Sequence, residues 1–88
     1  MKIANYNQLR AAVFMDATKD PEVADALRYS DRCCLYDVID GENQHGILVL
    51  TARTQLNDNV LTENGFDPAT ASAKLVLTLD RKTKCATF

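Results

Sequence analysis

The sequence predicts a small α+β domain whose elements follow the order ααββαββ. Three observations lead to this prediction. Residues 6–30 place apolar side chains at helical spacing on both sides of Pro21, residues 33–54 have the composition of two strands around a polar turn, and residues 75–88 form a second such pair. Helices and strands do not alternate as βαβ units, so we expect two antiparallel hairpins in one sheet with a short helix between them. A chain of 88 residues corresponds to one domain, residues 1–88.

The first helix is expected at residues 6–19. Asn5 precedes it and can cap it, because its side-chain oxygen can accept from the unpaired N–H groups of the first turn. One side of this helix is apolar and carries Tyr6, Leu9, Val13 and Ala17.

The second helix is expected to begin at Pro21 and to run to about Ser30. Asp20 can cap it, and proline suits the first helical position because its missing N–H would be unbonded there. Glu22 is favoured by the positive end of the helix dipole. The residues expected to face the core are Val23, Ala26, Leu27 and Ser30.

Residues 33–54 form the predicted central hairpin, with its turn between Gly41 and Gly46. A pairing of Ile39 with Ile47 would put Cys34, Tyr36, Val38, Leu48, Leu50 and Ala52 on one face. The opposite face would hold Cys33, Leu35, Asp37, Ile39, Ile47, Val49, Thr51 and Arg53. Both faces are largely apolar. In an antiparallel sheet with one face exposed to water, apolar and polar residues would instead alternate along each strand. Either the helices cover one face and a partner covers the other, or the helices are divided between the two faces.

A short helix is expected within residues 55–64, with Asn57 or Asp58 as its cap and Asn64-Gly65 as its end. Asp67-Pro68 begins another capped helical turn that lasts to about Ala73.

The C-terminal hairpin is expected to direct Leu75, Leu77 and Leu79 inward and to turn at Arg81-Lys82. A pairing of Leu79 with Lys84 would add Ala86 and Phe88 to the leucine face and point Cys85 outward.

Composition limits the functional classes. The net charge of −2 has the wrong sign for a general nucleic-acid binder. The sequence contains no apolar run long enough for a transmembrane helix, and its first residues lack the apolar region of a secretory signal. The odd count of 3 cysteines indicates reduced thiols, so we expect a cytoplasmic protein.

Thiol chemistry is one alternative function, carried by Cys33, Cys34 or Cys85 with His45, the single histidine. Adjacent cysteines in a strand point to opposite faces and do not chelate one metal together. His45 is expected in the central turn, far along the hairpin from Cys33 and Cys34. The sequence therefore favours small buried hydrophobes over a redox, catalytic or metal site, and it predicts no cofactor.

Nucleic-acid binding is a second alternative, through Arg81, Lys82 and Lys84 in residues 81–84. No aromatic residue is interleaved with these three charges, which disfavours this function. Basic residues at such a hairpin tip are more typical of a strand edge that is protected from pairing.

The leading hypothesis is a small non-enzymatic protein-interaction module that acts as an inhibitor or regulator. Accessory proteins of phages and mobile elements often fit this description. The partner would be another protein or a second copy of the chain. A second copy is the simplest version, because the two subunits of a symmetric dimer contact each other through the same patch. No membrane or small-molecule partner is indicated. The expected contact residues are Leu35, Asp37, Ile39, Ile47, Val49 and Arg53. In this prediction Asp37 pairs with Arg53 or with a basic group of the partner, or it marks the edge of the buried area.

Overall fold

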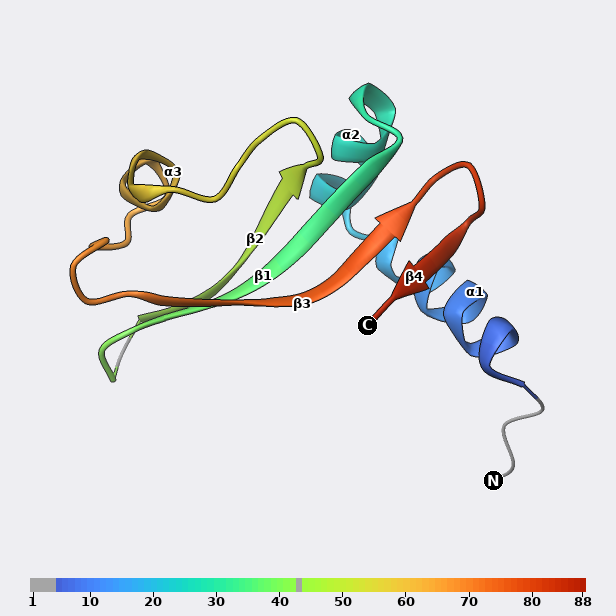
Figure 1. The fold of residues 1–88 in the computed structure, drawn as a ribbon, viewed down its shortest axis with the longest axis horizontal. Helices are drawn as coiled ribbons and strands as arrows, with labels where there is room; N and C mark the ends of the chain where they lie inside the picture. Colours follow the sequence, from blue (N-terminus) through green and yellow to red (C-terminus); the bar gives the residue numbers. More distant parts are fainter. Residues whose placement is uncertain (1–4, 43) are drawn as a thin grey trace.

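The fold consists of two helices, a hairpin, a short helix and two further strands, in the predicted order (Figure 1). The computed structural model describes residues 5–42 and 44–88. The helices are α1 (Tyr6–Ala17), α2 (Pro21–Tyr29) and α3 (Asp58–Glu63). The strands are β1 (Arg32–Asp40), β2 (Gln44–Thr51), β3 (Ser72–Asp80) and β4 (Cys85–Thr87). They form one antiparallel sheet in the order β2-β1-β3-β4.

Local capping explains where the helices begin. The side chains of Asn5, Asp20 and Asn57 accept hydrogen bonds from the backbone N–H groups of Gln8, Glu22 and Val60, respectively. Pro21 occupies the first turn of α2, as predicted. Gly65 follows α3 with a φ of 86°, a backbone conformation that glycine adopts without steric cost.

The helices are divided between the two faces of the sheet. On one face, which we call the helix face, Phe14 of α1 and Val23 and Leu27 of α2 pack on Cys33 and Leu79. On the other face, which we call the α3 face, Leu61 and Phe66 pack on Val38 and Leu48. In Figure 1 the α1–α2 pair and α3 lie at opposite ends of the long strands. This arrangement explains why both faces of the hairpin are apolar.

The predicted hairpin registers were each wrong by two residues. Ile39 pairs with His45 and Asp37 with Ile47, and Leu79 pairs with Ala86. In the central hairpin a shift by two keeps the paired side chains on their expected faces, because successive residues of a strand alternate between the two faces. The turn between the two strands is shorter than predicted, because β2 begins at Gln44. His45 therefore lies within β2 and not in the turn. Asn43 of that turn, like the N-terminal residues 1–4, lies outside the described residues.

Three expectations for the C-terminal half were also wrong. A bulge shifts the β1–β3 register between Leu35 and Tyr36, so that Leu77 pairs with Leu35 but Leu75 pairs with Tyr36. Leu75 therefore leaves the leucine face and is 49% exposed. Phe88 is also exposed, whereas Ala86 is fully buried. The expected helical turn after Asp67 ends early, because β3 begins at Ser72.

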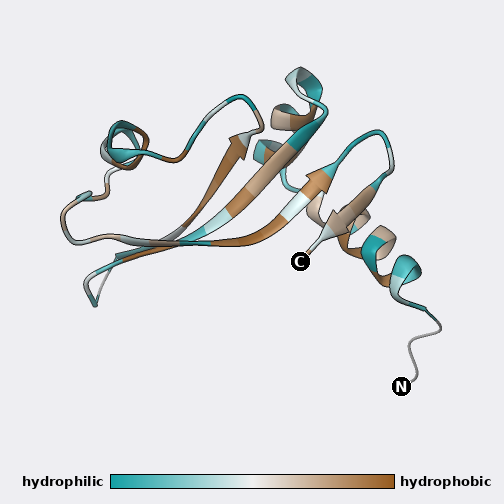
Figure 2. Ribbon diagram, viewed as in Figure 1, coloured by the Kyte–Doolittle hydropathy of each residue, from teal (hydrophilic) through white to brown (hydrophobic). Residues whose placement is uncertain are grey.

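Among the described residues, no helix combines the length and apolar character needed to cross a bilayer. Figure 2 shows the hydropathy along the ribbon: apolar residues gather along β2 and much of β3, whereas the turns are mostly polar.

Candidate protein-interaction surface

The helix face of the sheet is uncovered at its β1–β2 turn end. Leu35 and Val49, near the middle of the strands, are half-buried and pack against the core under α1 and α2. Nearer the turn, Ile39 is 50% exposed and Ile47 is 52% exposed. The two isoleucines are diagonal neighbours, because Ile39 pairs with His45 and Ile47 pairs with Asp37.

An ionisable pair occupies the other diagonal of the same four positions. The His45 Nε2 atom contacts the Asp37 Oδ1 atom, and the His45 side chain is 63% exposed against 33% for Asp37. Lys74 of β3 is exposed and lies directly opposite Asp37 in the β1–β3 register. We call the set Asp37, Ile39, His45, Ile47 and Lys74 the open patch. It is a small apolar centre with polar groups at its border, all on paired strands.

The six residues predicted to bind a partner therefore do not form one surface. Asp37, Ile39 and Ile47 belong to the open patch, whereas Leu35 and Val49 lie beside it, partly under the chain's own helices. Asp37 contacts His45 and not Arg53. Sequence reasoning missed His45 and Lys74 as members, because it placed His45 in the turn and did not establish that β3 lies beside β1. No sequence signal places Lys74 on this face, because strict alternation with Leu75 and Leu77 would put it on the opposite one and only the bulge in the β1–β3 register turns it here.

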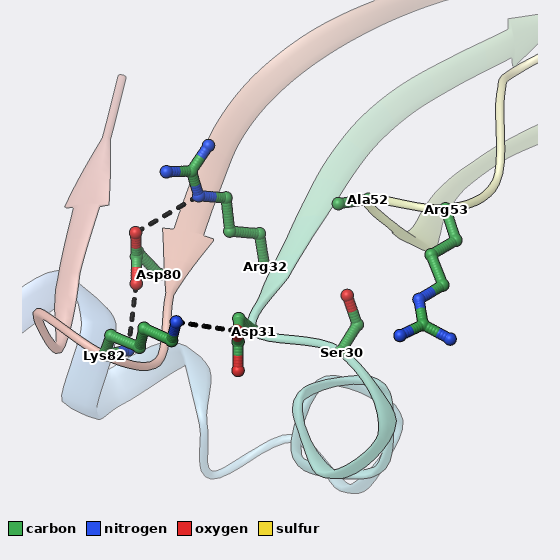
Figure 3. A pocket seen from close by; sticks show the side chains of 7 residues that line it. All are labelled: Ser30, Asp31, Arg32, Ala52, Arg53, Asp80 and Lys82. Atoms are coloured by element: carbon green, nitrogen blue, oxygen red, sulfur yellow. Dashed lines mark hydrogen bonds and ion pairs between the residues drawn. The ribbon is translucent and has the colours of Figure 1, made fainter.

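Arg53 lies at the opposite end of β2, in a pocket of about 320 Å³ (Figure 3). The pocket is lined by Ser30, Asp31, Arg32, Ala52, Arg53, Asp80 and Lys82. Its charges largely pair with one another: Arg32 Nε lies 3.2 Å from Asp80 Oδ2, and Lys82 Nζ lies 3.2 Å from Asp31 Oδ2. Arg53 makes no ion pair within residues 5–42 and 44–88, the part of the chain that the structure describes.

The ion pairs of this pocket tie the β3–β4 turn to the α2–β1 corner. Hydrogen bonds from Lys82 and Arg81 lower the pKa of Asp31. Burial alone would raise the pKa of Asp80, but hydrogen bonds from the Thr83 and Lys82 backbone N–H groups and from Arg32 outweigh it and lower that pKa. Two of the three basic residues at the predicted nucleic-acid tip, Arg81 and Lys82, are thus engaged with Asp31.

The thiols and the imidazole are well separated along the strands. Cys33 and Cys34 pair with Thr51 and Leu50, whereas His45 lies at the other end of β2. Five to six residues of strand correspond to roughly 17–20 Å. Cys33 is fully buried on the helix face, and burial raises the pKa of its thiol to about 11. Cys34 is on the α3 face, 3.8 Å from the Thr78 hydroxyl, so the adjacent cysteines point to opposite faces as predicted.

Cys85 pairs with Asp80 near the same end of the sheet as Cys33, which also places it far from the open patch. Within the described residues, no group of three or more His, Cys, Asp or Glu side chains is arranged to hold a metal ion.

The fold and the open patch together define a small α+β protein with helices on both faces of a four-stranded antiparallel sheet. No family model matches this chain, and neither a curated protein nor a solved structure matches it.

Proposed function

We propose that this protein is a non-enzymatic interaction module that inhibits or regulates a partner protein by binding it through the open patch. The observation that carries the proposal is the pair Ile39 and Ile47, each about half exposed and adjacent on a sheet face. The chain's own helices α1 and α2 bury Cys33 and Leu79 of that face and partly bury Leu35 and Val49, but they leave these two isoleucines exposed.

The composition of the patch supports protein binding over other uses. Two isoleucines on paired strands offer apolar surface that costs little backbone entropy to immobilise, because the sheet already holds them. Asp37, His45 and Lys74 surround them with donors and acceptors that can orient a partner. The separation of His45 from the three thiols makes thiol-dependent catalysis the weaker candidate.

Site-specific photo-crosslinking tests the proposal. A photoreactive phenylalanine derivative is placed at Ile39 in cells of the source organism, and at Leu75 as a matched control. Leu75 is also an apolar strand residue that is half exposed, but it lies on the α3 face. We expect a discrete protein adduct from position 39 and not from position 75. Equal labelling from both positions, or none from position 39, would contradict the proposal.

A substitution then connects the adduct to function. Ile39→Lys should abolish binding of the identified partner to the purified chain, whereas Leu75→Lys should leave binding unchanged. Both substitutions put a lysine at an exposed strand position, so a shared cost in folding cancels between them. Identical binding by the Ile39→Lys variant and the unmodified chain would refute the role of the patch.

A further inference from the structure

The two edges of the sheet are built differently. β4 is only three residues long, and α1 lies along it (Figure 1). The Arg10 Nε group of α1 donates to the Ala86 carbonyl oxygen at 2.7 Å. β2 is eight residues long, Gln44–Thr51, and contains no proline, lysine or acidic residue. Proteins normally protect a strand edge with such residues or with a cover, so the β2 edge has the features of a pairing site.

The hydrogen-bond pattern identifies which β2 groups face outward. The Ala52 N–H donates to the carbonyl of Arg32, which is opposite it in the β1–β2 register. Bonded pairs recur every second residue in an antiparallel ladder, so the even-numbered residues of β2 bond to β1. The Arg81 N–H donates to the Asp31 carbonyl, at the start of the β1–β3 ladder. By the same rule, the backbone groups of the odd-numbered residues of β1 bond to β3, which leaves those of the even-numbered residues for β2. The outward-facing backbone groups therefore belong to His45, Ile47, Val49 and Thr51.

One end of this edge is already used. The Thr51 carbonyl accepts from the Thr54 N–H, where the chain turns after β2. The stretch that remains open runs from His45 to Val49 and is centred on Ile47. We infer that two copies of this chain pair antiparallel through this stretch, with Ile47 on the two-fold axis, to form one continuous eight-stranded sheet. In this register His45 pairs with Val49 of the other copy, and each opposed pair exchanges two backbone hydrogen bonds.

The shape of the helix face suits this pairing. On each copy α2 covers the Thr51 end of β2, and the open patch lies at the His45 end. Antiparallel pairing sets the covered end of one copy beside the open end of the other. The α2 helix of each copy then flanks the open patch of its neighbour, and Ile47 becomes buried against its own counterpart. An interface between the same residues of both copies closes on itself and stops at a dimer.

Charge complementarity favours the same orientation. Arg53 follows β2 and makes no ion pair among the described residues, and the exposed Glu42 lies in the β1–β2 turn at the other end. The antiparallel arrangement puts Arg53 of each copy beside Glu42 of the other. This relation between opposite charges occurs twice in the dimer by symmetry.

The inference rests on the proposed function, since it names a second copy as an occupant of the open patch. The first test is the molar mass in solution, by light scattering from micromolar to near-millimolar concentration. We expect a species of twice the 9.8 kDa mass of the chain. Ile47→Lys should make it monomeric, and Leu75→Lys, at a similarly exposed strand position, should leave it dimeric.

Charge reversal tests the orientation without altering the sheet. Glu42→Arg places like charges at both contacts of a homodimer, and so does Arg53→Glu. Each variant alone should associate on the order of tenfold more weakly than the unmodified chain. An equimolar mixture of the two restores both attractions and should regain the original dimerisation. A mixture that associates no better than either variant alone would overturn the antiparallel arrangement.

The outcomes separate this inference from the function on which it rests. A chain that stays monomeric at every concentration overturns the β2 pairing. If that monomer still gives the Ile39 adduct with another protein, the proposed function stands with a different occupant. If it gives no adduct, both proposals fail.

Discussion

The carboxylate of Asp40 accepts a hydrogen bond from the hydroxyl of Thr70 at 2.6 Å, across 30 residues of sequence. The same carboxylate accepts the backbone N–H of Asp67 at 2.8 Å. Asp40 is the last residue of β1, and Asp67 and Thr70 lie in the turn between α3 and β3. This link holds that turn against the end of the strand that supports the open patch.

The Asp40 link predicts an acid-sensitive contribution to stability. The hydrogen bonds from Thr70 and from the Asp67 backbone lower the pKa of Asp40 below its ordinary value of 3.8. A lowered pKa in the folded state contributes stability above the unfolded value, and this stability is lost as the pH falls through the folded pKa. Asp40→Asn should therefore reduce the difference between the urea midpoints measured at neutral pH and near pH 3.

Asp25→Asn is the matched control for this measurement, because the Asp25 side chain is exposed and makes no hydrogen bond or ion pair among the described residues. An Asp40→Asn variant with the same acid sensitivity as Asp25→Asn would show that the link is absent in solution.

Gly46 predicts a steric coupling between β2 and the segment after α3. A Cβ atom at this position would lie 3.1 Å from Phe66 Cζ, and the Phe66 ring is buried. Gly46→Ala should lower the free energy of unfolding by about 1–2 kcal/mol, since the ring must move within a packed core. Denaturant unfolding measures the effect. The double variant Gly46→Ala with Phe66→Leu should lose less than the sum of the two single changes; strict additivity would mean that the two groups do not touch.

The thiols should differ sharply in reactivity. Burial raises the pKa of Cys33 to about 11, so alkylation of Cys33 near neutral pH should require unfolding, while Cys34 and Cys85 should react first. In the folded state the Cys33 thiol stays protonated up to about pH 11, whereas in the unfolded state it ionises near its ordinary pKa of 9.0. Stability should consequently fall between about pH 9 and 11, and Cys33→Ala should flatten that decline. Mass spectrometry after timed alkylation identifies the order; rapid modification of Cys33 in the native protein would contradict it.

Lys84 predicts a stabilising substitution. It is the non-glycine residue with a positive φ among those described, at 55°, in the turn before β4. An L-residue in this region carries a steric cost of about 1–2 kcal/mol, which glycine does not have. Glycine also loses more conformational entropy on folding, and this loss offsets part of the stability gained by removing the steric cost. Lys84→Gly should raise the free energy of unfolding by about 0.5 kcal/mol, whereas the β-branched Lys84→Val should lower it. Thermal unfolding of the three proteins gives the ranking, and a glycine variant less stable than the parent would refute this account.

The site was only partly predictable from the sequence. The alternating apolar pattern identified Ile39 and Ile47 as residues of a common face. The predicted register was wrong by two residues, but a shift by an even number does not move a side chain to the other face, so this result held. Nothing in the pattern showed that α1 and α2 would stop over Leu35 and Val49, or that Lys74 would lie beside Asp37. Those positions depend on which strand enters the sheet next to β1.

The sequence by itself determined the order of the elements, the helix starts at Asn5 and Asp20, a third helix start at Asn57 or Asp58, and which residues share each face of the central hairpin. These features depend on interactions within a few residues: side-chain caps, proline and glycine conformations, and the two-residue period of a strand. Only the tertiary structure decided the strand order β2-β1-β3-β4, the bulge that turns Leu75 outward, and the division of the helices between the faces. Those choices depend on the burial free energy summed over segments far apart in the chain, and no local pattern of residues contains that sum.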